Sequence, residues 1–110
     1  MINIAIKEDY AEILGSFGDL QSAINLAVQR YTIEKITTKI AELKQKNLDY
    51  EIKYQVDYPT FFQKIQQDED FINYLEDKVE KLWEIDLSDW EFCYRGITDW
   101  TEKLQAILLV

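Results

Sequence analysis

The sequence predicts a mainly α-helical protein with one short N-terminal strand, a long helix and a C-terminal helical hairpin or bundle. Residues 2–7 alternate apolar and polar side chains, which is typical of a strand. Residues 20–47 and 83–108 instead carry apolar side chains three and four positions apart, which is typical of helices. The 110 residues are enough for a domain with a modest core.

The N-terminal segment has the two-residue period of a strand. Isoleucine occupies positions 2, 4 and 6, and the outward-facing set of the predicted strand is Asn3, Ala5 and Lys7. A lone strand leaves its backbone groups unpaired in a monomer. We therefore expect either a second strand elsewhere in the chain or the same strand from another copy, and we favour a homodimer.

A long helix is predicted from residue 20 to residue 47. Asp19 precedes it and is a preferred N-cap residue, because its carboxylate can accept from the free amides of the first turn. The next segment, residues 49–56, alternates polar and apolar side chains and alone predicts a strand. We favour a continued helix or an extended connector there.

The C-terminal part of the sequence predicts several further helices. Proline at position 59 breaks the chain, Thr60 and Gln63 match a capping box, and the acidic run at 68–70 suits a helix start. The last stretch has apolar side chains at alternating spacings of four and three, interrupted by one threonine: Trp83, Leu87, Trp90, Tyr94, Ile97, Thr101, Leu104 and Leu108.

The composition excludes several classes of chemistry. The chain has no histidine, which removes Ser-His-Asp catalysis and histidine-ligated metals, and its one cysteine cannot form an internal disulfide. No set of carboxylates fixes three or more oxygen ligands in one place, so we expect no metal, no cofactor and no enzymatic activity. The sequence lacks a secretion leader and a long apolar run, which predicts a cytoplasmic protein without membrane contact.

The charge is unevenly distributed along the chain. The net charge is −9; residues 1–50 have seven acidic and six basic residues, whereas residues 51–110 have fourteen and six. This asymmetry indicates two surfaces with different partners, although solvated acidic helix faces explain it as well. The tryptophans lie in the acidic half, which favours core packing or a protein interface over stacking on nucleic acid bases.

The order of elements at the N-terminus is that of a ribbon-helix-helix module, in which two chains pair their strands and place them in the DNA major groove. The strings INIAIKEDYAEIL and GDLQSAINLAVQRYTIEKITTKIAELKQK resemble the N-terminal part of small bacterial antitoxins with such a start. The downstream strings YEIKYQVDYPTFFQKIQQ and LWEIDLSDWEFCYRGITDWTEKLQAIL resemble the toxin-neutralising tail of such antitoxins.

The resemblance implies a function in two parts. Residues 1–48 would dimerise and bind operator DNA through Asn3, Ala5 and Lys7, repressing transcription from the operon's own promoter. Residues 49–110 would bind and neutralise a small basic toxin, with contacts from Trp83, Asp86, Asp89, Trp90, Glu91, Tyr94 and Trp100. The alternative is a non-catalytic α-helical scaffold or adaptor protein that binds no nucleic acid.

Overall fold

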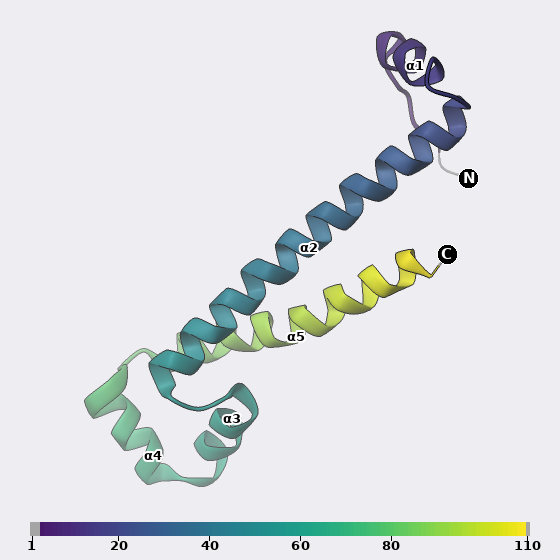
Figure 1. Ribbon diagram of the computed structural model, residues 1–110. Coiled ribbons are helices and arrows are strands. Elements are labelled where there is room, and N and C mark those ends of the chain that lie inside the picture. Colours follow the sequence, from purple (N-terminus) through teal and green to yellow (C-terminus); the bar gives the residue numbers. More distant parts are fainter. Residues whose placement is uncertain (1–2, 110) are drawn as a thin grey trace. The chain divides into compact units, whose positions relative to one another are not determined.

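The computed structural model describes residues 3–109, and all of their regular secondary structure is helical (Figure 1). The elements are α1 (Glu8–Gly15), α2 (Leu20–Tyr54), α3 (Tyr58–Gln67), α4 (Glu69–Tyr74), a π-helical turn η1 (Leu75–Val79) and α5 (Trp83–Leu108). Contacts divide the chain into two compact units, Met1–Lys35 and Ile36–Val110, and α2 contributes residues to both. We call them the N-terminal unit and the C-terminal unit.

The predicted N-terminal strand is wrong. Residues 3–7 have no regular secondary structure, and the described residues contain no strand, so they form no ribbon-helix-helix module. Ile2 lies outside the described residues. Ile4 and Ile6 are exposed, as are Asn3, Ala5 and Lys7, so the alternation does not separate a buried face from a solvent face. A stretch of alternating residues forms a strand only where another strand pairs with it, and the described residues offer none.

Helix α2 begins at the residue predicted from the sequence and ends later. Asp19 accepts a hydrogen bond from the Ser22 N–H at 2.9 Å, which supplies the predicted N-cap. The helix continues past residue 47 to Tyr54, so most of the ambiguous segment 49–56 is helical. It ends at Gln55, whose φ of 59° places it in the left-handed region and whose N–H donates to the Glu51 carbonyl at 2.7 Å.

Two aspartates set the starts of the short helices. Asp57, rather than the predicted Thr60, caps α3: its carboxylate accepts from the Thr60 N–H at 2.9 Å, and Pro59 occupies the first turn. Asp68 accepts from the Phe71 N–H at 3.2 Å and caps α4 in the same way. Helices α3 and α4 then lie where α2 ends and α5 begins (Figure 1).

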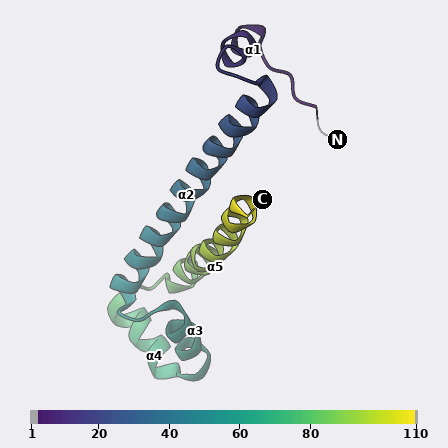
Figure 2. The ribbon, with the colours of Figure 1, turned by 45° about the vertical axis from the view of Figure 1, so that its right-hand side comes forward.

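The C-terminal unit is organised around the antiparallel pairing of α2 with α5, visible in both ribbon views (Figures 1 and 2). The side chain of Leu43 reaches α5 at Gly96, and the Trp90 indole N–H donates to Asn47 Oδ1 at 2.8 Å. Along this part of α2, buried or half-buried side chains recur at spacings of four and three: Ile36, Ile40, Leu43, Asn47, Tyr50 and Tyr54.

The packed face of α5 largely follows the predicted one, with exceptions at Tyr94 and Leu108. Both Trp90 and Cys93 are fully buried, whereas Tyr94, placed on the predicted face, is 40% exposed. Leu108 is also exposed, and Ile107 beside it is half-buried. The other six predicted positions are buried or half-buried: Trp83, Leu87, Trp90, Ile97, Thr101 and Leu104.

Candidate interaction surfaces

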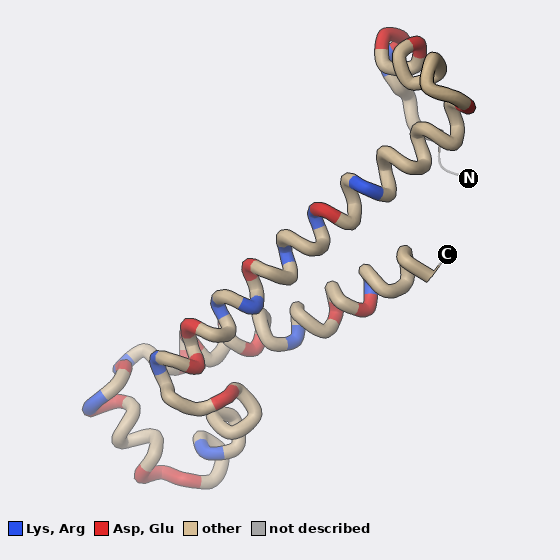
Figure 3. Tube along the Cα trace, viewed as in Figure 1, with Lys and Arg blue, Asp and Glu red and all other residues tan. Residues whose placement is uncertain are grey.

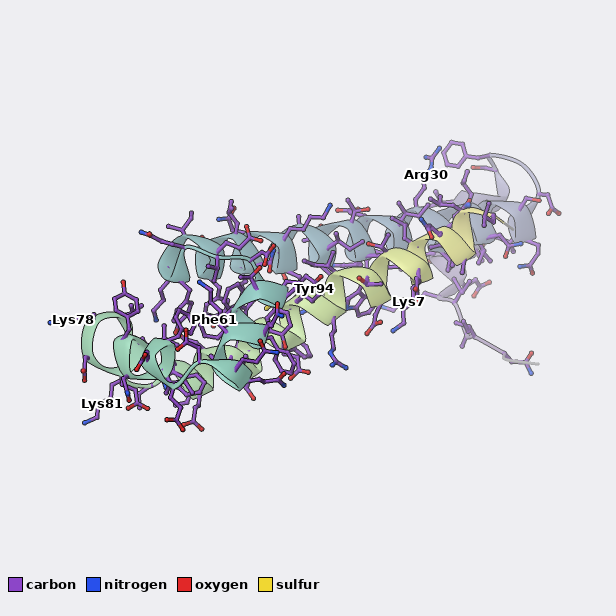
Figure 4. The ribbon with its side chains drawn as sticks, turned by 90° about the horizontal axis from the view of Figure 1, so that it is seen from below. Lys7, Arg30, Phe61, Lys78, Lys81 and Tyr94 are labelled. Atoms are coloured by element: carbon purple, nitrogen blue, oxygen red, sulfur yellow. The ribbon has the colours of Figure 1, made fainter. Side chains whose placement is uncertain are left out.

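An aromatic cluster fills the C-terminal unit, and Trp90 lies at its centre with no exposed surface. The rings of Tyr50, Tyr54 and Tyr58 lie 5.6 Å from the Trp90 ring, centroid to centroid, and the ring of Phe61 lies at 5.1 Å. Phe61 projects from α3 toward this cluster between the helices (Figure 4). Contacts from two long helices and α3 therefore converge on one indole, which makes Trp90 a core residue.

Two tyrosine–carboxylate hydrogen bonds border the aromatic cluster. The Tyr50 hydroxyl donates to Asp89 and the Tyr54 hydroxyl donates to Asp86, both at 2.6 Å. Burial, together with these negatively charged acceptors, raises the pKa of both tyrosines above the ordinary value. The two phenols therefore remain neutral donors at neutral pH and fasten α2 to α5.

Lys53 adds an ion-pair network to the same border. Its ammonium lies 2.6 Å from Asp86 Oδ2 and 2.9 Å from Glu80 Oε1. The hydrogen bond to Asp86, followed by that to Glu80, raises the pKa of Lys53. Because Asp86 also accepts from Tyr54, its carboxylate is occupied on the inside of the fold.

The residues predicted to bind a partner thus divide into two groups. Trp83 and Trp90 are buried, and Asp86 and Asp89 are half-buried acceptors of internal hydrogen bonds. The remaining three lie nearer the surface: Glu91, Tyr94 and Trp100. The structure brings most of the predicted set together, but as parts of a core and its border; their contact with a partner stays a prediction.

The three outer residues lie along α5. Glu91 pairs with Arg95 at 3.0 Å, one helical turn away. Tyr94 packs its ring against Tyr58 at a centroid distance of 4.9 Å and points away from α5 (Figure 4). Trp100 lines a shallow depression of about 430 Å³ on α5, where the Lys103 ammonium lies 4.3 Å from the centre of its ring.

The N-terminal unit has a different character, because none of its described residues, 3–35, is buried. Nine of its large apolar side chains are instead exposed to solvent: Ile4, Ile6, Tyr10, Ile13, Phe17, Leu20, Leu26, Val28 and Tyr31. Phe17 is 81% exposed and Tyr31 is 63% exposed. Exposed apolar groups in this number on so short a segment are typical of a surface that another protein covers.

Sequence reasoning missed this surface. The three-four spacing of apolar residues after Asp19 predicts a helix with one buried face, and nothing in the pattern says whether the chain itself covers that face. One signal was available: the spacing of the first stretch ends at Tyr31, because the following positions on that face are Glu34, Lys35 and Thr38.

The residues predicted to contact DNA are exposed, but they do not lie on a strand. Asn3 and Ala5 fall in the irregular segment before α1, and Lys7 is the residue that precedes its first turn. Lys7 is also the only basic residue of the three. The arrangement of base-contacting side chains that a paired ribbon would provide is therefore absent from the described residues.

Charge follows the division into units. The N-terminal unit has three basic and five acidic residues, a net charge of −2, and the C-terminal unit has nine and sixteen, a net charge of −7. Acidic side chains recur on α4, η1 and α5 (Figure 3). The charge asymmetry seen in the sequence therefore falls mainly on the unit with the aromatic core.

No protein-family model, curated protein or solved structure matches the chain. Within residues 3–109, no helix is both long and apolar enough to cross a membrane. The described part of the chain also contains no group of three or more histidine, cysteine, aspartate or glutamate residues that could hold a metal ion.

Proposed function

We propose that this chain is a non-catalytic α-helical adaptor that binds other proteins, in keeping with the alternative interpretation of the sequence. The observation that carries the proposal is the contrast between its units. The C-terminal unit has a buried aromatic core and ten exposed large apolar side chains, whereas the described part of the N-terminal unit, residues 3–35, has nine exposed large apolar side chains and no buried residue. Removing such surface from water is the main driving force of protein association.

The N-terminal unit is the protein-binding region in this proposal. Its small net charge, −2, sets up little repulsion against another protein surface. The homodimer predicted from the sequence is one form of this contact. Operator binding depended on the paired ribbon and is therefore not part of the proposal, whereas the predicted cytoplasmic location is retained.

Neutralisation of a small basic toxin is a second candidate, and the net charge of −7 on the C-terminal unit favours it. A surface of this sign attracts a basic partner and speeds the encounter. Contacts would fall on exposed residues of this unit, because Trp90 has no surface available to a partner. Tyr94 on α5 is a predicted contact residue that does have such surface.

Site-directed photo-crosslinking in cells tests the proposed function. A photoreactive phenylalanine analogue replaces Phe17 or Tyr31 in the N-terminal unit, and Phe92 on α5 serves as a control that is similarly exposed, at 63%. We expect discrete protein adducts from positions 17 and 31. Absence of adducts at both positions, in cells that express the chain at its native level, would overturn the adaptor proposal.

The toxin candidate needs a separate measurement. Purified chain and a small basic protein encoded beside its gene are mixed, and binding is followed by calorimetry at low and at high salt. Affinity that falls steeply with salt supports electrostatic recognition by the C-terminal unit. Equal affinity at both salt concentrations, or no binding, contradicts it.

A further inference from the structure

We infer that the apolar stripe Leu20, Ile24, Ala27 and Tyr31 on α2 binds the same stripe of a second copy in antiparallel orientation. Ile24 is half-buried, and the other three residues are exposed. The inference rests on the proposed function and names the partner of its N-terminal unit. Three properties of the unit support a second copy: the spacing of the stripe, the distribution of charge along it and the amount of apolar surface.

The spacing of the stripe is the same in both directions. Its four residues are separated by four, three and four positions, which places them on one face of a helix. Reversing the helix leaves this spacing unchanged, so two antiparallel copies align Leu20 with Tyr31 and Ile24 with Ala27. A two-fold interface requires a surface that is complementary to itself, and this alignment pairs a larger residue with a smaller one at its centre.

The charges near the stripe favour the antiparallel orientation. Asp19 lies at its start, whereas Arg30, Glu34 and Lys35, with a net charge of +1, lie near its end, and Arg30 extends outward from α2 (Figure 4). Antiparallel pairing brings the acidic start of one copy beside the basic end of the other. A parallel pairing would bring the basic residues of both copies together, which is unfavourable. The dipoles of the two helices also favour the antiparallel pairing, because the positive end of each lies beside the negative end of the other.

The exposed apolar surface matches what a dimer needs. The nine exposed side chains of the N-terminal unit include three aromatic ones, Tyr10, Phe17 and Tyr31. Together the nine present on the order of 800 Å² of apolar surface, similar to the area each partner buries in an interface of standard size. Two of the nine, Leu20 and Tyr31, belong to the stripe, and two more, Tyr10 and Ile13, lie on α1.

Light scattering coupled to size exclusion tests the inference on the full chain. We expect a dimer for the native sequence and a monomer for Ala27→Glu, which places a carboxylate at the centre of the stripe. Because the change occurs twice per dimer, we expect the dissociation constant to rise about a hundredfold. Gln29→Glu is the matched control: it adds the same charge two residues away, on the opposite side of the helix, and we expect it to leave the dimer intact.

Cysteine crosslinking tests the orientation. One chain carries Ile24→Cys and another carries Ala27→Cys, and the fully buried native Cys93 is left unchanged in both. Antiparallel pairing gives a disulfide-linked dimer mainly when the two chains are mixed. Crosslinking of each variant mainly with itself would show a parallel pairing and overturn the inference.

The outcomes separate this inference from the proposed function. A native chain that stays monomeric at high micromolar concentration overturns the dimer, as does a dimer that Ala27→Glu leaves unaffected. In either case, photo-crosslinks from positions 17 and 31 to a different protein would still support the adaptor. Absence of both a dimer and any crosslinked protein would contradict both proposals.

Discussion

Replacing Trp90 by alanine is expected to be the most damaging substitution in the C-terminal unit. The indole is fully buried, contacts four aromatic rings and donates to Asn47. Truncating a buried tryptophan costs about 3–5 kcal/mol, and loss of the hydrogen bond to Asn47 adds about 1 kcal/mol. The sum is a large part of the roughly 5–15 kcal/mol by which small domains are stable. We therefore expect Trp90→Ala to lower the free energy of unfolding of this unit by about 4–6 kcal/mol.

Urea unfolding followed by circular dichroism measures this effect. Phe92→Ala is the matched control, because Phe92 is an exposed aromatic residue on the same helix two positions away. We expect the control to change the free energy of unfolding by less than about 0.5 kcal/mol. A loss below about 1 kcal/mol for Trp90→Ala would refute the assignment of Trp90 to the core, and would return it to the candidates for partner contact.

Three further predictions concern the C-terminal unit and the end of α2. Gln55→Gly should stabilise the protein by about 1 kcal/mol, because glycine adopts the left-handed conformation of Gln55 without strain. The urea midpoint should rise accordingly, and an unchanged midpoint would contradict the prediction. The pKa values of Tyr50 and Tyr54 are higher in the folded state than in the unfolded state. The stability that these raised pKa values supply is therefore complete below pH about 10, and above that pH it falls by about 1.4 kcal/mol per pH unit for each tyrosine. The double variant Tyr50→Phe, Tyr54→Phe should flatten this alkaline decline in urea unfolding, and an equally steep decline would contradict the assignment. A Cβ at Gly96 would lie 2.9 Å from a methyl of Leu43, and in Gly96→Ala the gain in helix propensity should offset this close contact, so that thermal unfolding is nearly unchanged. Gly96→Leu should cost about 1–3 kcal/mol of stability, because the larger side chain overpacks the site. A Gly96→Leu variant as stable as the native chain would contradict this.

The sequence predicted the start of the long helix but not its end. Asp19 gives the start through a local hydrogen bond, which sequence can indicate. At 49–56, Tyr50 and Tyr54 fit both a two-residue period and a helical one. The helix is decided by tertiary contacts, because both tyrosines meet Trp90 while Ile52, between them, is 66% exposed. Such contacts across the chain leave no trace in local periodicity.

The predictions of an N-terminal strand and of a packed position for Tyr94 on α5 failed for related reasons. Alternating isoleucines before Lys7 satisfy the strand pattern, but a strand requires a partner that the described residues lack. On α5, both Cys93 and Tyr94 continue a three-four spacing from Trp90, and the larger, more aromatic residue was the natural choice from sequence. The structure buries Cys93 instead and leaves Tyr94 at the edge of the cluster against Tyr58.

The proposed function assigns separable roles to the two units. Tryptophan and tyrosine are the residues most often found at the energetic centre of interfaces, but Trp90 is already packed inside the protein. Phe17 and Tyr31 are exposed and belong to a unit with no buried described residue. A substitution such as Tyr31→Glu should therefore abolish association while leaving urea unfolding of the C-terminal unit unchanged, and Trp90→Ala should act first on unfolding. If Tyr31→Glu lowered the unfolding midpoint as strongly as Trp90→Ala, the N-terminal apolar surface would be part of the core and not an interface.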